Sequence, residues 1–209
     1  YSDINYLALT LLMGMMLFVE AFLIRRIGRK ESFPKLVKSQ RGIWIGEHQM
    51  KKSAIIPMFL LVPGGAIDSF APYWPLISLG EENYAFVLFP FLLGFSHHVR
   101  SVLTPIAAKH LAKRIALLGL LITLISGVGY LFEGMSLVAL VVGLVGREFI
   151  TYRYNLKENK EVALYKPEEE GIRVLGVIPG TTAERLEIQV GEVITKVNDR
   201  RVSHPDEFY

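Results

Sequence analysis

Residues 171–202 read GIRVLGVIPGTTAERLEIQVGEVITKVNDRRV. Gly171 and Gly191 each open a short segment rich in β-branched residues, and a Pro-Gly pair at 179–180 leads into a short helical stretch. An Asn-Asp turn at 198–199 then precedes Ser203, which is a good helix N-cap. This order of elements predicts a small α/β domain over residues 171–209, and we expect its last helix to be truncated at Tyr209.

The residues before this domain are typical of a membrane protein. The chain has 209 residues, of which 51% are hydrophobic; long apolar runs fall within residues 1–152, and the remainder is rich in charge. A helix needs about 20 apolar residues to cross a bilayer. The sequence therefore predicts a polytopic all-α membrane domain over residues 1–152, followed by a charged linker over 153–170. The spans that we expect are 4–24, 53–70, 84–98, 115–132 and 136–152.

The charged residues between these runs predict an orientation. Residues 25–52 contain nine Lys or Arg, and residues 98–114 contain four with no acid, whereas residues 71–83 contain two Glu and no base. Cytoplasmic loops of membrane proteins carry an excess of Lys and Arg. We therefore expect a multi-pass protein of the cell membrane with Tyr1 on the outer side and the C-terminal domain in the cytoplasm.

The C-terminal motif resembles a PDZ domain of the bacterial type. PDZ domains bind an extended peptide as an added strand beside a sheet edge, and a glycine-containing loop receives the terminal carboxylate through its backbone N–H groups. The resemblance implies a loop at 169–172, a receiving strand at 173–178, and a groove helix that begins at Ser203. The implied peptide-binding residues are Glu170, Gly171, Ile172, Arg173, Val174, Leu175 and, on the groove helix, Phe208.

This chain departs from the PDZ pattern just before the loop glycine. The family usually has an apolar residue there, whereas residues 168–170 are three glutamates. Their negative charge would repel a free C-terminal carboxylate, so an internal peptide or purely structural contacts are alternatives. A small appendage without a ligand also remains open.

Motifs for catalysis, cofactors or metals are missing from the sequence. There is no cysteine, and neither His-Glu-x-x-His nor Gly-x-Ser-x-Gly occurs. The adjacent pair His97 and His98 points to different faces of a helix, which does not suit a shared metal. The net charge is only +3 and the bases lie in separate loops, so a nucleic-acid role explains them poorly. We expect no enzyme activity, no cofactor, no metal and no nucleic-acid partner.

Two further patterns leave alternatives open. Residues 61–75 contain several Pro and Gly, which fit either a kinked span or a broken transporter helix. Small residues within the last two predicted spans permit close helix packing or self-association. These are Gly119, Gly127, Gly129, Ala139, Gly143 and Gly146.

Taken together, the architecture, the Val62-Pro-Gly-Gly and Phe70-Ala-Pro-Tyr-Trp-Pro stretches and the module at 171–202 resemble the MinJ family of bacterial division-site (Min system) membrane scaffolds. The resemblance implies an adaptor that positions cell-division proteins at poles and septa through its PDZ-like domain, with the lipid bilayer as its other partner. A PDZ-bearing membrane protease with catalytic residues outside these 209 residues is the rival prediction. A transporter with a regulatory tail is a third.

Overall fold

The computed structural model describes residues 6–27, 31–39, 42–63, 76–79, 82–129, 131–132, 134–166 and 170–203. These residues fall into two compact units. One unit comprises Tyr1–Lys52 together with Phe95–Tyr209, and the other comprises Ser53–Gly94. Each unit is described by itself below.

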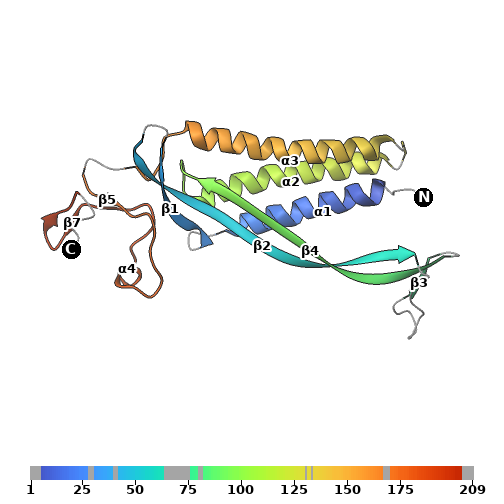
Figure 1. The fold of residues 1–209 in the computed structure, drawn as a ribbon, viewed down its shortest axis with the longest axis horizontal. Helices are drawn as coiled ribbons and strands as arrows, with labels where there is room; N and C mark the ends of the chain where they lie inside the picture. The colour runs from blue at the N-terminus through green and yellow to red at the C-terminus, as the bar shows by residue number, and fades with distance from the viewer. Residues whose placement is uncertain are drawn as a thin grey trace. The chain divides into compact units, whose positions relative to one another are not determined.

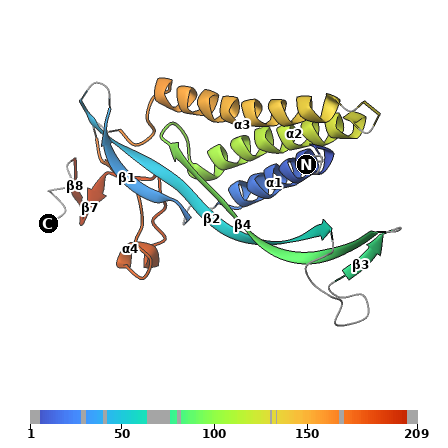
Figure 2. The same ribbon diagram turned by 45° about the vertical axis from the view of Figure 1, so that its right-hand side comes forward.

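Three long helices form the first unit's apolar part. They are α1 (Tyr6–Arg25), α2 (Thr104–Gly129) and α3 (Gly134–Lys160), and they lie side by side in both views of the ribbon (Figures 1 and 2). Each is long and apolar enough to cross a membrane. They coincide with three of the predicted spans, at 4–24, 115–132 and 136–152. Two of them extend further than predicted, because α2 begins at Thr104 and α3 continues to Lys160.

Small residues allow these helices to approach closely. A Cβ atom added to Gly119 of α2 would lie 3.3 Å from the carbonyl oxygen of Gly14 in α1. Gly146 and the fully buried Ala139 of α3 likewise lie at helix contacts, Gly146 against Leu118. Gly127 differs, since an added Cβ would meet nothing within 4 Å. Most of the small residues noted in the sequence thus allow helices of the same chain to pack closely. Small residues commonly have this role between membrane helices, whose association lacks a hydrophobic driving force.

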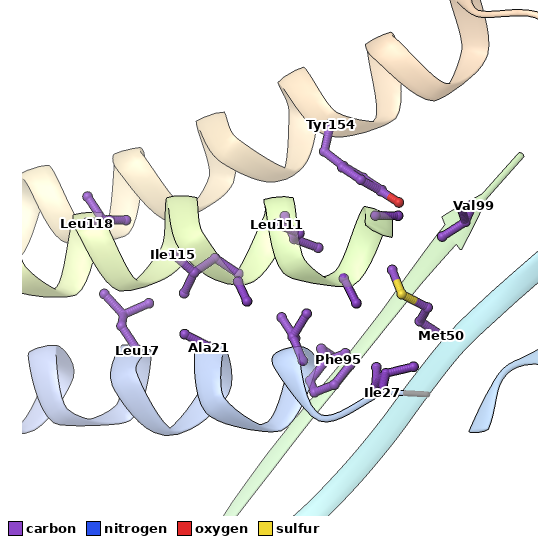
Figure 3. Packing of buried hydrophobic residues seen from close by; sticks show 14 of the residues in the cluster. Leu17, Ala21, Ile27, Met50, Phe95, Val99, Leu111, Ile115, Leu118 and Tyr154 are labelled. Atoms are coloured by element: carbon purple, nitrogen blue, oxygen red, sulfur yellow. The ribbon is translucent and has the colours of Figure 1, made fainter. Parts of the chain in front are cut away.

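The buried core continues from the helices to the start of the sheet. Leu17, Leu111 and Ile115 fill the space between α1 and α2 (Figure 3). Met50 and Val99, which come from two strands, are fully buried in the same cluster. The strand residues that belong to this unit are therefore anchored to one end of the helical bundle by apolar contact.

Two of the five predicted helical spans are strands in the described residues, so the prediction of an all-α membrane domain is wrong there. The sheet has the order β1-β2-β4-β3. Its strands are β1 (Phe33–Lys38), β2 (Trp44–Pro63), β3 (Leu76–Leu79) and β4 (Glu82–Val99). The predicted span 53–70 falls on β2 up to Pro63, and its remainder lies outside the described residues. The predicted span 84–98 lies within β4.

The local sequence explains this difference. Side chains from Lys51 to Phe59 alternate between exposed and half-buried, which is the period of two of a strand. Pro57 would break a helix, but a strand tolerates proline at an unpaired edge. β1 pairs with β2 only along residues 44–49, so Pro57 lies beyond that pairing. An apolar run shorter than about 18 residues does not by itself distinguish a helix from a strand.

The predicted linker at 153–170 is also partly wrong. Its first eight residues, 153–160, continue α3, and Tyr154 is buried against the core. Tyr165 then forms an antiparallel bridge with Gly46 of β2. Residues 167–169, which include two of the three glutamates, lie outside the described residues.

The contact between Gly14 and Gly119 yields a prediction. Gly119→Leu should destabilise the bundle by about 1–3 kcal/mol or more, because the new side chain meets the backbone of α1 rather than a flexible side chain. Gly127→Leu, which makes the same change on the same helix in open space, should be tolerated. Thermal unfolding of the two variants in detergent micelles checks this, and equal stability would contradict the proposed helix contact.

Candidate functional site

The C-terminal part of the first unit is built from short strands and tight turns. β5 (Ile172–Arg173) pairs antiparallel with β6 (Val193–Ile194), and β7 (Lys196–Val197) pairs with β8 (Arg200–Arg201). The β5–β6 ladder continues one step further. Val174 N–H donates to the Glu192 carbonyl, and Gly191 N–H donates to the Val174 carbonyl, each at 2.8 Å.

Turns and glycines of this part follow the sequence predictions closely. The Pro-Gly pair precedes α4 (Thr182–Arg185), and Asn198 and Asp199 both adopt positive φ between β7 and β8. Such a two-residue turn matches the twist of a hairpin, and Asn and Asp tolerate this conformation better than most residues. The predicted Pro-Gly lead into a short helix and the predicted Asn-Asp turn are therefore both confirmed.

Gly171 occupies a position that requires glycine. Its φ is +93°, and an added Cβ would lie 2.8 Å from the carbonyl oxygen of Ile194. At Gly171 the chain thus passes β6 too closely for any side chain, which fixes the backbone path at this residue.

All of the predicted peptide-binding residues except Phe208 lie within one described segment, residues 170–175. Glu170 is exposed, and Ile172, Arg173, Val174 and Leu175 are half-buried along one segment. The regular strand is shorter than the predicted receiving strand, since it covers residues 172–173 and the ladder ends at Val174. Phe208, with the rest of the predicted groove helix after Ser203, lies outside the described residues.

This segment packs against the sheet of the same unit. Leu175 and Tyr165 both contact Gly46 of β2 so closely that a side chain at Gly46 would clash with them. Gly46 N–H donates to the Tyr165 carbonyl at 2.8 Å. Next along the chain, Gly176 lies against Pro34 of β1. One face of the predicted receiving segment is therefore already in contact with β1 and β2.

A cluster of buried charges, which the sequence analysis missed, lies where β2, β4 and α3 meet. Glu47 of β2 is 2% exposed, and its Oε2 accepts a hydrogen bond from Arg100 Nε at 2.8 Å. His98 Nδ1 lies 3.2 Å from the other oxygen of Glu47. Arg100 also donates to Asn159 Oδ1 at 3.0 Å, so one guanidinium joins β2 to the end of α3.

Glu158 of α3 holds the same loop from the other side. Its carboxylate accepts the backbone N–H of Arg100 at 2.7 Å, and the backbone N–H and hydroxyl of Ser101 at 3.0 Å each. Charge-assisted bonds of this kind are stronger than neutral ones. We refer to Glu47, Arg100, Ser101 and Glu158 as the junction cluster.

Two histidines lie buried beside the junction cluster. His48 Nδ1 is 2.9 Å from the Ser32 hydroxyl, and burial lowers the pKa of His48 against a weaker opposing effect of the Leu175 backbone. Burial lowers the pKa of His97 to about 4, and the electrostatic effects of Arg147 and His98 act in the same direction. His97 packs between Phe95 and Tyr154, at 6.0 and 5.7 Å between ring centroids.

Neither histidine belongs to a metal site in the part of the chain that the structure describes, where no group of three His, Cys, Asp or Glu is arranged to hold an ion. The two nitrogens of His97 are buried and have no hydrogen-bond partner. The ring therefore acts as a neutral packing element.

A second buried ion pair joins two of the apolar helices. Arg147 Nε of α3 donates to Glu20 Oε2 of α1 at 3.0 Å, and Glu20 is 5% exposed. Arg147 also contacts Thr151, one turn further along α3. The sequence analysis did not predict this pair, whose members are 127 positions apart. Removing one partner of such a buried pair leaves an uncompensated charge, which is far costlier than the pair itself.

His97 predicts a dependence of stability on pH. Its pKa is about 4 in the folded protein and ordinarily 6.5. Between these two pH values, His97 binds a proton in the unfolded chain but not in the folded chain. The stabilisation is complete above pH 6.5 and is lost as the pH falls toward 4, by about 3 kcal/mol. His97→Phe keeps a ring in the same space and should reduce this dependence, with the contribution of the buried His48 retained.

Thermal unfolding in detergent micelles between pH 4.5 and 7.5 measures the effect. The control is His110→Phe, which removes an exposed histidine from α2 and should leave the wild-type pH dependence unchanged. A wild-type dependence retained by the His97→Phe protein would contradict the assignment.

Comparisons with known proteins identify one similar curated protein. The chain is 31% identical over 202 residues to the cell division topological determinant MinJ of Bacillus subtilis (strain 168), which covers 97% of this chain and 51% of that protein. No family model matches the chain. No solved structure matches it either.

That relative's name describes a determinant of cell-division topology and names no reaction, in agreement with the expectation of a protein that is not an enzyme. The alignment extends over the helices, the sheet and the C-terminal strands alike. The chain spans about half the length of the relative, and its similarity to that protein extends over nearly all of its own length.

Proposed function

We propose that this chain is the membrane-anchored part of an adaptor that positions cell-division proteins, with its PDZ-like C-terminal segment as a protein-binding surface. The observation that carries the proposal is the 31% identity to a division topological determinant along 97% of the chain. Three helices capable of crossing a membrane support the anchoring role. A domain fixed at a membrane raises the local concentration of whatever it binds, and this requires no catalysis.

The arrangement that we propose has three crossings, made by α1, α2 and α3. Residues 25–52 and 98–114, which carry most of the Lys and Arg, then lie on the same side of the membrane without any crossing between them. The positive-inside rule places that side in the cytoplasm. The end of α3 and the PDZ-like segment lie there as well, and the N-terminal end of α1 lies outside.

A reporter and localisation experiment tests this proposal. An enzymatic reporter that is active only in the cytoplasm, fused after Tyr209 of the full chain, should be active, and the same reporter fused before Tyr1 should be inactive. A fluorescent fusion should gather at septa and poles, because the role requires enrichment at division sites. Uniform fluorescence around the cell envelope would contradict the division-site role, and an inactive C-terminal reporter would contradict the orientation.

We also propose that the peptide-binding surface comprises the loop at Glu170 and Gly171, the segment from Ile172 to Leu175, and Phe208. The fixed backbone path at Gly171 supports a preformed loop. Leu175 already contacts Gly46, whereas Glu170 at the other end of this stretch is exposed. The negative charge at this end favours an internal segment with positive charge over a free carboxylate.

A charge reversal tests this surface. Glu170→Lys changes an exposed side chain beside the loop, and it should lower the recovery of co-purifying division proteins at least threefold by repelling a basic segment. Glu187→Lys makes the same reversal at another exposed position of the same segment and should have no effect. Recovery from detergent-solubilised membranes, quantified by mass spectrometry, compares the two. Equal recovery from both variants would contradict a role for this loop.

A further inference from the structure

A groove of about 650 Å³ lies between α1 and α2. Its apolar part is lined by Phe18 and Phe22 from α1 and by Leu117 and Leu120 from α2, with Ala116 between them. The four large side chains are each at least 40% exposed. Small residues on both helices leave the space that these side chains border.

One end of this groove is basic. Arg25, at the end of α1, lines it together with Lys109 and Lys113 of α2. The two lysines are four residues apart and therefore lie on the same face of the helix. In the part of the chain that the structure describes, no acidic side chain forms an ion pair with any of the three. Arg26 adds a further positive charge nearby, stacked at 4.5 Å over the Phe22 ring.

The groove has the dimensions of one bilayer leaflet. Lys109 and Leu120 are eleven residues apart on α2, which corresponds to about 16 Å along the helix. The hydrocarbon of one leaflet is about 15 Å thick, half of the bilayer core. A molecule with an anionic head at Lys109 would therefore extend its apolar part along the groove to the depth of the bilayer centre.

We propose that this groove binds an anionic phospholipid, with its phosphate between Arg25, Lys109 and Lys113 and an acyl chain along Phe18, Leu117 and Leu120. Basic pockets between membrane helices on the cytoplasmic side are suited to such headgroups. A soluble anion would match the charges but leave the apolar length uncovered. A zwitterionic lipid would cover the apolar length but gain less from three positive charges.

The proposal rests on the membrane anchoring proposed above, and it adds a ligand to it. Purified full-length chain in detergent micelles is titrated with dioleoyl phosphatidylglycerol or with dioleoyl phosphatidylcholine, and bound lipid is counted by native mass spectrometry. The anionic lipid should bind at least tenfold more tightly than the zwitterionic one. Glycerol phosphate, which carries the charge but no acyl chain, should not displace it.

The decisive variant is Arg25→Gln/Lys109→Gln/Lys113→Gln. It should weaken phosphatidylglycerol binding roughly 10- to 100-fold, as expected for the loss of three charges near a lipid phosphate. The matched control, Arg114→Gln/Arg153→Gln/Lys160→Gln, removes three exposed charges that do not line the groove and should bind like wild type. Ala116→Trp, which fills the apolar part without changing charge, should also weaken binding.

Three outcomes would overturn the proposal. These are unchanged binding in the groove variant, equal loss in the control, or no preference between the two lipids. Loss of a co-purifying acidic protein from the groove variant, with lipid binding intact, would assign the groove to a protein segment instead. Extraction of wild-type chain from membranes by alkaline carbonate would contradict the anchoring itself, whereas retention in the membrane without lipid preference contradicts this inference alone.

Discussion

The fold of the first unit depends on two buried carboxylates that converge on one short loop. Glu47 and Glu158 both bind the segment at Arg100 and Ser101, one through the guanidinium and the other through backbone N–H groups. Burying a charge without such partners is costly, so these bonds define where β4 must end and α2 must begin. Strand residues of the first unit, the helical bundle and the segment after α3 all meet at this point.

The C-terminal segment is tied to the same region rather than only following it in sequence. Leu164 N–H donates to the Arg100 carbonyl at 2.7 Å, and Tyr165 pairs with Gly46 one position from Glu47. Leu175 of the C-terminal segment then covers Gly46. In the residues that the structure describes, the proposed binding surface thus contacts the proposed anchor through packed side chains.

Local signals in the sequence were sufficient for some elements and insufficient for others. Long apolar runs located α1, α2 and α3, and the Asn198–Asp199 turn was predictable because those residues tolerate positive φ. The strands β2 and β4 were mistaken for helices, since hydropathy measures burial in lipid or protein without specifying the backbone. The bonds of Arg100 to Glu47 and Asn159 join residues 53 and 59 positions apart, and no local pattern reports such pairs. Phe208 and the predicted groove helix stay predictions.

The replacement of two predicted crossings by β2 and β4 has a consequence for topology. The proposed arrangement has three crossings instead of the predicted five, which is an even difference, so each end of the chain keeps the face that the distribution of lysine and arginine predicts for it. Experiments that locate only the two ends of the chain therefore cannot distinguish three membrane crossings from five. What separates the two arrangements is the environment of residues 53–94, which in one case are enclosed by acyl chains and in the other are accessible to water-borne reagents on the cytoplasmic face.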